Sequence, residues 1–282
     1  MKVLYVLKGE PDYMCDVVMH GLYNLLGADL THTAEYPLMY KPLTTPEELL
    51  ATYGKGFTMW GNLPEYLNDN SDIATKIENK YFDYIIYGST RRCLDYYDIA
   101  TLHYPKDRII LIDGEDDTYV IEGTGNPLFK RELTQAHDKV FPISFAIPEE
   151  KITKEISEKK HILSKYRPMV TGSGYIFNSE EDYYRDYQES LYGVTHKKSG
   201  WDCMRHYEIL GNGCIPLFQD LQNCPELTMT NFPKDLILRS NELFDVDSDE
   251  RLEILDKLFN YTKTHLRTID VAKYILNTIK KI

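Results

Sequence analysis

The chain has 282 residues, and its hydrophobic content of 43% is ordinary for a globular protein with room for two modest domains. Its net charge of −12 argues against sequence-independent binding to nucleic acid, which relies on lysines and arginines that neutralise phosphates. Five scattered cysteines, the lack of a signal peptide and the lack of a long apolar run predict a cytoplasmic protein without a membrane span.

The first half of the chain alternates apolar runs with turns and helix-like segments. A strand is predicted at 2–8, a turn at 9–12, and a helix at 13–26 that Gly27 closes. Residues 35–70 are rich in proline and glycine and are expected to form an irregular insert, which in an α/β domain is often functional. Further strands are predicted at 81–87, 108–112 and 140–147.

The second half repeats this rhythm after a charged segment at 148–160, which is expected to be a linker. A strand is predicted near 169–172, and Ser179 is expected to cap the helix that follows. Two more helices are predicted at about 249–264 and 268–281. Because strands that alternate with helices imply parallel sheets, the sequence predicts an α/β fold. Two doubly wound, Rossmann-like domains, 1–150 and 151–282, are expected to face each other across a cleft.

Residues 193–218 combine a strand, a turn, a helix and a second strand in one short stretch. The runs typical of strands are 194–196 and 214–218. Ser199 followed by Asp202 is a capping-box pattern, which predicts the start of a helix. Gly211 and Gly213 are expected to end that helix, because glycine adopts the left-handed cap conformation without a Cβ penalty.

The turn before this helix is expected to hold an anion, because exposed N–H groups and the helix dipole meet at a helix start. Its polar members are Lys197, Lys198, Ser199 and Gly200. Beyond the turn, Trp201, Arg205 and Glu208 have the spacing of one helix face. An anion seat beside an arginine and a carboxylate suits a nucleoside diphosphate and its ribose. Trp201 is expected either to stack on a base or sugar or to anchor the core.

Glu208, Gly213 and Pro216 have the spacing of the nucleotide-sugar signature of GT-B glycosyltransferases. Residues 192–235 resemble the exostosin-like and group-1-type members of that family in particular. In the family this glutamate holds the donor ribose, so the resemblance implies that role for Glu208. Many group-1 members carry a further glutamate eight residues earlier, where this chain has Gly200. The resemblance also implies a GT-B-like arrangement and catalysis with no metal ion and no cofactor other than the nucleotide sugar itself.

The predicted donor-binding residues lie in two places. Gly172, Ser173 and Tyr175 belong to a glycine-rich turn after an apolar run, where the backbone can approach a nucleotide closely. The others belong to residues 193–218: Lys197, Lys198, Ser199, Gly200, Trp201, Arg205 and Glu208. Arg205 is also expected to stabilise the charge that develops on the leaving diphosphate.

Catalysis also needs a group that deprotonates the acceptor. Asp16 and His20 are one helical turn apart, and a histidine oriented by a carboxylate is a common general base; a surface pair or a satisfied half-buried histidine is the alternative. Asp116 is a second candidate, in an acidic run at 113–117 that could also bind a metal ion or be a solvated loop. Residues 129–132 carry a basic pair and are expected to be helical. The predicted acceptor-side residues are Asp12, Ser89, Thr90 and Arg91, which follow predicted strands.

The sequence therefore predicts a glycosyltransferase, of hexosyl or pentosyl type, that moves a sugar from a nucleotide-diphosphate sugar to an acceptor hydroxyl. The acceptor is left open between a glycan, a small molecule and a modified DNA base of the phage or viral type. A nucleotide-sugar epimerase and a noncatalytic nucleotide-sugar-binding protein fit the same residues, and Gly200 in place of a glutamate keeps the latter open.

Overall fold

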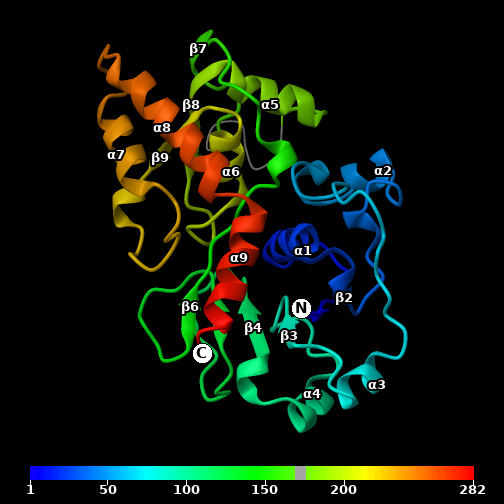
Figure 1. Cartoon of the computed structure of the whole chain (residues 1–282). Helices are drawn as coiled ribbons and strands as arrows, with labels where there is room; N and C mark the ends of the chain where they lie inside the picture. The colour runs from blue at the N-terminus through cyan, green and yellow to red at the C-terminus, as the bar shows by residue number, and fades with distance from the viewer. Residues whose placement is uncertain (169–175) are drawn as a thin grey trace.

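The computed structural model describes residues 1–168 and 176–282, which form two parallel β-sheets with helices packed around them (Figure 1). The larger sheet has the strand order β2-β1-β3-β4-β5-β6, and every neighbouring pair is parallel. Its strands are β1 (Val3–Val6), β2 (Leu30–His32), β3 (Tyr84–Tyr87), β4 (Ile109–Asp113), β5 (Leu128–Lys130) and β6 (Val140–Pro142). Strands β1, β3 and β4 are buried along their whole length, as the continuous apolar runs of parallel sheets usually are.

The smaller sheet has the order β7-β8-β9 and is also parallel. Its strands are β7 (His161–Leu163), β8 (Ser190–His196) and β9 (Ile215–Gln219). Helices α5 (Glu180–Gln188) and α6 (Met204–Gly211) connect these strands in sequence. After α6, Gly213 has φ +61, a conformation that glycine adopts at little cost, and the chain turns directly into β9.

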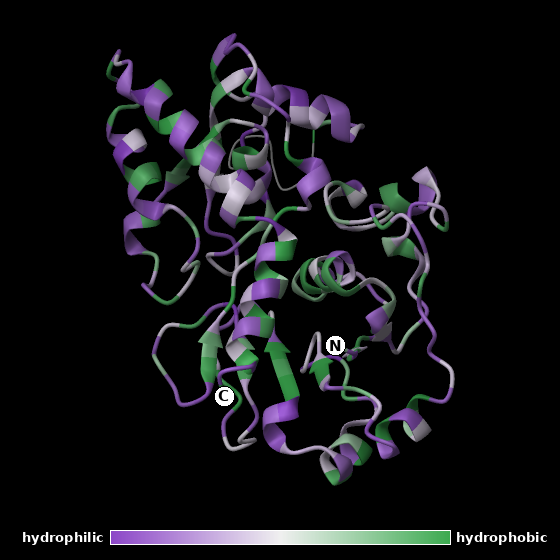
Figure 2. Cartoon of the chain, viewed as in Figure 1, coloured by the Kyte–Doolittle hydropathy of each residue, from purple (hydrophilic) through white to green (hydrophobic). Residues whose placement is uncertain are grey.

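The larger sheet is covered on both faces. Val3 and Tyr5 of β1 belong to a hydrophobic cluster that includes residues of α1 and α9, whereas Leu4 and Val6 belong to one that includes residues of α3 and α4. Figure 2 shows the strands of this sheet in hydrophobic colours. The remaining helices are α1 (Tyr13–Leu26), α2 (Pro46–Leu50), α3 (Ile73–Glu78), α4 (Tyr97–His103), α7 (Lys234–Glu242), α8 (Glu250–His265) and α9 (Thr268–Ile279).

The last helix of the chain returns to the first half of the molecule. A bridge between Ile147 and Arg267 precedes α9, which packs along α1 (Figure 1). The contact is so close that a Cβ on Gly21 would lie 2.1 Å from the carbonyl oxygen of Thr268. The two sheets fall on either side of residue 150, but the first half is completed by the C-terminal helix.

Several predicted elements are confirmed. The α/β class and the parallel sheets are as expected, and helix 13–26 matches α1, with the Asp12 side chain as its N-cap and Gly27 as its C-cap. Ser179 caps α5 by accepting a hydrogen bond from the Asp182 N–H, as expected. The confirmed strands near the predicted positions are β1, β3, β4, β8 and β9.

Other expectations were wrong. The helix expected to start at Ser199 begins at Met204 instead. Residues 129–132 are not helical, because β5 occupies 128–130 and a turn follows. The strand expected at 140–147 ends at Pro142. The short strands β2, β5 and β7 were not predicted, because three-residue strands give too little periodicity to be seen in the sequence.

Candidate functional site

The start of α6 carries Arg205, and Glu208, the glutamate of the signature, lies one turn further along the helix. Arg205 and Glu208 are 2% and 1% exposed and lie three positions apart on the helix. The N-cap residue, Cys203, makes no side-chain capping hydrogen bond. An uncapped helix start presents N–H groups and a partial positive charge to whatever lies in front of it, which favours an anion.

The guanidinium of Arg205 is buried and has no ion-pair partner within residues 1–168 and 176–282. Its Nε and Nη1 atoms have no hydrogen-bond partner among these residues. Its Nη2 atom lies 3.5 Å from the Tyr166 hydroxyl, and the group lies 5.4 Å from the centroid of that ring. The Nε and Nη1 donors are therefore available to an anionic ligand. Such a ligand would stabilise the fold, because a buried unpaired charge is costly.

The carboxylate of Glu208 accepts two hydroxyl groups from distant parts of the chain. Thr58 Oγ1 donates to Oε1 at 2.5 Å, and Tyr183 donates to Oε2 at 2.7 Å. Burial raises the pKa of Glu208, although these hydroxyls and the charge of Arg205 lower it. The carboxylate is therefore a hydroxyl acceptor in a dry setting, which is what a ribose diol requires.

The turn from β8 to α6 differs from the expected helix start. Lys197, Lys198 and Ser199 are exposed, and the Lys197 ammonium lies 5.0 Å from the centroid of the Trp201 ring. Trp201 is partly buried, 6.4 Å from the Phe218 ring between centroids, and lies outside the helix that carries Arg205 and Glu208. The expectation that Trp201 shares a helix face with Arg205 and Glu208 was therefore wrong, because α6 begins only at Met204.

Asp202, which was expected to complete a capping box with Ser199, uses its carboxylate elsewhere. It accepts the Phe145 N–H at 2.6 Å and the Tyr207 hydroxyl at 2.9 Å. Burial raises its pKa to about 6, although the charge of Arg131 lowers it. Arg131 in turn donates to the Asp202 carbonyl at 2.6 Å, so this residue ties the end of β5 to the second half of the chain.

The absence of a glutamate at position 200 has a local explanation. A Cβ on Gly200 would stand 2.5 Å from Oε1 of Glu132 and 3.1 Å from Oδ1 of Asp116. Glu132 is itself 2% exposed and accepts the N–H groups of Trp201 and Asp202, each at 3.0 Å. A carboxylate from the first half thus lies against the backbone where many group-1 enzymes have a glutamate side chain.

The start of α1 brings the first half to Arg205 and Glu208. Burial raises the pKa of the Tyr13 hydroxyl, the charges of Glu208 and Asp16 raise it further and that of Arg205 lowers it, so Tyr13 is within electrostatic reach of all three. Its ring also packs against Trp60, with centroids 5.0 Å apart. Tyr13 was missed in the sequence because nothing local distinguishes it from the other 22 tyrosines among the 23 in the chain.

Asp16 is fully buried close to Tyr13. Its Oδ2 atom accepts Trp60 Nε1 at 2.7 Å and the Tyr36 hydroxyl at 3.0 Å, and its Oδ1 atom has no partner among the described residues. Burial, with the nearby charge of Asp12, raises its pKa well above the usual range, against these hydrogen bonds. A carboxyl group with a raised pKa and a free oxygen has the properties of a proton acceptor.

The expected hydrogen-bonded pairing of Asp16 with His20 is not found. His20 is 1% exposed, and its Nδ1 and Nε2 atoms contact Thr268 Oγ1 at 2.8 Å and Glu150 Oε1 at 2.9 Å. The ring therefore faces α9 and the segment after β6. One turn of spacing puts two residues near one another on a helix, but here the neighbouring elements decide which partner each side chain meets.

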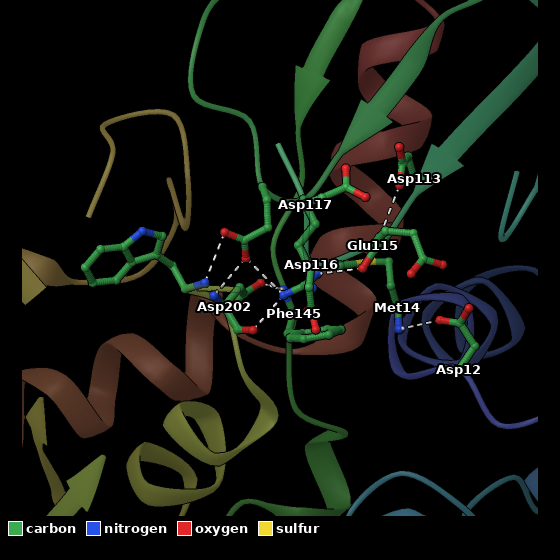
Figure 3. Close-up of polar contacts among 12 residues, drawn as sticks. Asp12, Met14, Asp113, Glu115, Asp116, Asp117, Phe145 and Asp202 are labelled. Carbon is green, nitrogen blue, oxygen red and sulfur yellow. Dashed lines mark hydrogen bonds and ion pairs between the residues drawn. The ribbon is translucent and has the colours of Figure 1, made fainter. Parts of the chain in front are cut away.

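The acidic run at 113–117 follows β4, and Figure 3 labels its four carboxylate residues. Arginines from other segments pair with these carboxylates. Asp113 and Asp117 pair with Arg91, Glu115 with Arg92, and Asp116 with Arg131. A pocket of about 210 Å³ lies at this edge between the acidic run and the start of α1. Its polar and aromatic lining comprises Asp12, Tyr13, Tyr53, Arg92, Glu115, Asp116, Arg131 and Phe145.

The residues expected on the acceptor side are only partly in this pocket. Asp12 lines it while capping α1 and lying 3.3 Å from Arg92. Ser89 and Thr90 are 7% exposed and form the turn after β3, where the Thr90 N–H donates to the Ile112 carbonyl. The Arg91 guanidinium donates hydrogen bonds to Asp113, Asp117 and the Tyr119 carbonyl, so Arg91 holds the acidic loop in place.

Three of the predicted donor residues, Gly172, Ser173 and Tyr175, lie outside the described residues. Within residues 1–168 and 176–282, no group of three His, Cys, Asp or Glu side chains is placed to hold a metal ion. No helix in the same ranges is both long enough and apolar enough to cross a bilayer.

No protein-family model matches the chain, and no curated protein matches it in sequence. Two solved structures are similar in fold. Anabaena Alr3699/HepE in complex with UDP and glucose has a TM-score of 0.50, 10% identity and 100% coverage of both chains. An alpha-glucosyltransferase in complex with UDP and a 13-mer DNA containing a central A:G mismatch has a TM-score of 0.47, 11% identity and 99% coverage of both chains. The chain therefore has the fold of the Anabaena protein along its whole length.

Proposed function

We propose that the chain is a glycosyltransferase of the GT-B type, which transfers a sugar from a nucleotide-diphosphate sugar to an acceptor hydroxyl. In this proposal the second half of the chain binds the donor, the first half binds the acceptor, and the two face each other across a cleft. The donor diphosphate is stabilised by side chains, and no divalent metal ion is needed.

The observation that carries the proposal is the unpaired guanidinium of Arg205 at the uncapped start of α6. A buried cation with free donors is stabilised by an anion, and a planar guanidinium matches phosphate oxygens. Glu208, one turn further along the helix, is then placed to accept ribose hydroxyls. Positive charge fixed in a dry site stabilises a leaving diphosphate in the transition state.

Other predicted donor contacts stay part of the proposal. Lys197, Lys198 and Ser199 lie on the exposed turn ahead of α6, where they can approach phosphates from solvent. Trp201 offers a partly exposed ring beside them. The glycine-rich turn of Gly172, Ser173 and Tyr175 is proposed to contact the nucleotide.

For the catalytic base we propose Asp16, on the strength of its raised pKa, its free Oδ1 atom and its position near Tyr13. Asp116 is the second candidate, but its carboxylate is already engaged in an ion pair with Arg131. His20 would have to leave Thr268 and Glu150 to take part. The acceptor is proposed to bind in the pocket between the acidic run and α1.

The fold shared with Anabaena Alr3699/HepE supports the donor class, because that protein was crystallised with UDP and glucose. At 10% identity this support concerns the architecture, and the assignment of individual residues rests on the contacts of Arg205 and Glu208.

The direct test is titration of the purified chain with UDP, ADP, GDP, CDP and TDP by calorimetry. At least one should bind, and Glu208→Gln should weaken that binding by about 1.5–3 kcal/mol, the usual worth of a hydrogen bond to a charged group. Glu253→Gln, on the exposed face of α8, is the matched control and should not change affinity. If Glu208→Gln binds as the unmodified chain does, or if no nucleoside diphosphate binds even after the Thr58 hydroxyl that covers Glu208 is removed, the donor site is elsewhere.

Product analysis then separates the functions that share this site. Incubation with a nucleotide sugar and a panel of glycans, small alcohols and hydroxymethylated DNA should release the nucleotide only when an acceptor is modified, and excess chelator should not change the rate. An isomerised nucleotide sugar without acceptor indicates an epimerase. Binding without any turnover indicates a sensor, and loss of activity with chelator contradicts metal independence.

A further inference from the structure

The proposed ribose acceptor, Glu208, is covered by a segment from the other half of the chain. Thr58 lies in the irregular insert between β2 and β3, 150 positions before Glu208, and its hydroxyl donates to Oε1 at 2.5 Å. Because that hydroxyl has one proton, the Tyr184 hydroxyl at 2.7 Å must donate to Thr58. Thr58 is fully buried in this arrangement. A protein hydroxyl thus stands where a ribose hydroxyl is proposed to bind.

The segment that carries Thr58 is held in place by contacts with residues near the start of α5. The Lys55 ammonium donates to the Phe177 carbonyl at 2.6 Å and to Asn178 Oδ1 at 2.8 Å. The Thr58 N–H donates to Glu180 Oε1 at 2.5 Å. Glu180, at the start of α5, is also paired with Lys151 at 2.6 Å. These contacts, which we call the 55–58 latch, join the two halves of the chain.

The backbone of the latch is strained at two positions. Lys55 has φ +60 and Thr58 has φ +74, and neither is a glycine. A β-branched residue rarely adopts positive φ, and such conformations persist only where surrounding contacts hold them. Release of the contacts at Lys55 and Glu180 would therefore let the segment relax away from Glu208.

We propose that Thr58 is a built-in competitor of the donor ribose, and that the nucleotide enters by displacing the 55–58 latch from Glu208. The inference rests on the proposed function of Glu208. Glu208 is 1% exposed and is covered by the Thr58 and Tyr183 hydroxyls that donate to it, so a ribose can reach the carboxylate only when one of these groups moves away. Of these two hydroxyl groups, that of Thr58 is the one that can move away, because Thr58 lies on a strained loop whereas Tyr183 lies within α5. The latch lowers the fraction of molecules that are competent to bind, which weakens the apparent affinity by that fraction.

The first test compares nucleotide affinity across matched variants, with UDP as the first probe and the other four nucleoside diphosphates beside it. Thr58→Val keeps the shape but removes the hydroxyl, and should bind on the order of tenfold more tightly than the unmodified chain. Thr58→Ser keeps the hydroxyl and should bind within about twofold of it. Lys55→Met loosens the latch from outside the site and should also bind more tightly. Equal or weaker binding by both Thr58→Val and Lys55→Met overturns the proposal.

The second test is hydrogen exchange of residues 53–61 with and without UDP. Displacement predicts that exchange of these amides becomes faster when the nucleotide binds. If binding instead protects them, the segment closes over the donor and the proposal is wrong.

The two proposals fail in different ways. If Glu208→Gln binds nucleotide as the unmodified chain does, Glu208 does not hold the ribose, and the proposal that Thr58 competes with the ribose is wrong as well. If Glu208→Gln weakens binding but Thr58→Val and Lys55→Met do not strengthen it, the ribose role of Glu208 stands and only the proposal that Thr58 competes with the ribose is wrong. If the unmodified chain binds none of the five nucleotides while Thr58→Val binds one, the latch is supported; if neither binds, both proposals are wrong.

Discussion

Arg205 illustrates how one side chain can indicate a ligand. Most buried cations in this chain are paired: Arg131, for example, donates to Asp116, Glu132 and the Asp202 carbonyl. Arg205 is just as buried and has no such partner in the described part of the chain. The free energy of the unliganded fold is therefore raised at this position, and an anion would lower it.

Replacement of Arg205 by methionine, which is similar in volume, should leave the melting temperature of the free protein unchanged or raise it, because the unpaired charge is removed. The same variant should lower kcat by about 10²–10³-fold, since a donor to the leaving group is lost. Thermal melting without ligand and steady-state kinetics measure the two effects. Arg205→Lys serves as the control and should recover only part of kcat, because it lacks the planar fork. A variant that melts early but turns over normally would make Arg205 a structural residue.

For Asp16, substitution by asparagine keeps the size of the side chain but removes the proton acceptor. Turnover should fall by about 10²–10⁴-fold while nucleotide affinity stays within about twofold, because the residue contacts no part of the donor. Since the ionised carboxylate is the base, activity of the unmodified enzyme should be lost as the pH falls through its raised pKa, well above the range of a free aspartate. A pH–rate profile measures this loss of activity at low pH.

His20→Ala is the companion variant for Asp16→Asn. Its ring bonds Thr268 and Glu150, so the variant should melt at a lower temperature and keep its turnover in the folded fraction. If His20→Ala loses turnover and Asp16→Asn does not, the base has been assigned to the wrong residue of the helix.

Among the elements, α1 links the fold to the site. Its first turn carries Tyr13 and Asp16, and its middle packs on α9 through the bare backbone of Gly21. Packing with α9 therefore fixes the axis of the helix that positions the proposed base. The element is specified locally by the Asp12 cap and by a run of buried apolar residues, but its neighbour is supplied by the end of the chain.

Gly21→Ala should destabilise the fold by about 3 kcal/mol, because the new methyl group would meet the backbone of Thr268, which cannot swing aside as a side chain can. Urea unfolding measures the change. Lys273→Ala on the exposed side of α9 is the control, and its effect should be within about 0.5 kcal/mol. Stability equal to the unmodified chain would mean that α9 shifts along α1 without loss of packing.

In the molecule as a whole, the two halves meet through buried polar groups. Arg131 and Glu132, at the end of β5, contact the backbone of residues 201 and 202, and Asp202 returns a hydrogen bond to Phe145. The Thr58–Glu208 contact and α9 add two further connections. The relative position of the halves is thus set by specific hydrogen bonds, which lose their value if either half moves by an ångström or two.

The raised pKa of Asp202 makes this junction sensitive to pH. With a folded-state pKa of about 6 and an unfolded value near ~3.9, the folded state binds more protons between these values. Its contribution to stability is therefore greatest below pH ~4 and is lost as the pH rises to 6. Asp202→Asn should remove this slope, so the free energy of unfolding of the variant relative to the unmodified chain should rise between pH 4 and 6 and then level off. Urea unfolding across pH measures it, with exposed Asp256→Asn as the control; parallel curves would contradict the assignment.

The sequence by itself determined the local features of this protein. Apolar runs specify β1, β3 and β4, and side-chain caps at Asp12 and Ser179 specify the starts of α1 and α5. Gly213, just after α6, specifies the turn that ends this helix. These depend on neighbours within a few positions, whose geometry the backbone fixes. The signature around Glu208 is of the same kind, and the spacing of a helix face added Arg205 to it.

Only the tertiary structure decided which side chains meet. Ser199 and Asp202 have the pattern of a cap, yet the helix starts later because Phe145 and Tyr207 hold the Asp202 carboxylate. Asp16 and His20 share a helix, yet α9 and Glu150 take the histidine. Thr58 reaches Glu208 across 150 positions, which no periodicity records. In each case a polar group has several possible partners of similar energy, and long-range packing brings one of them within hydrogen-bond distance.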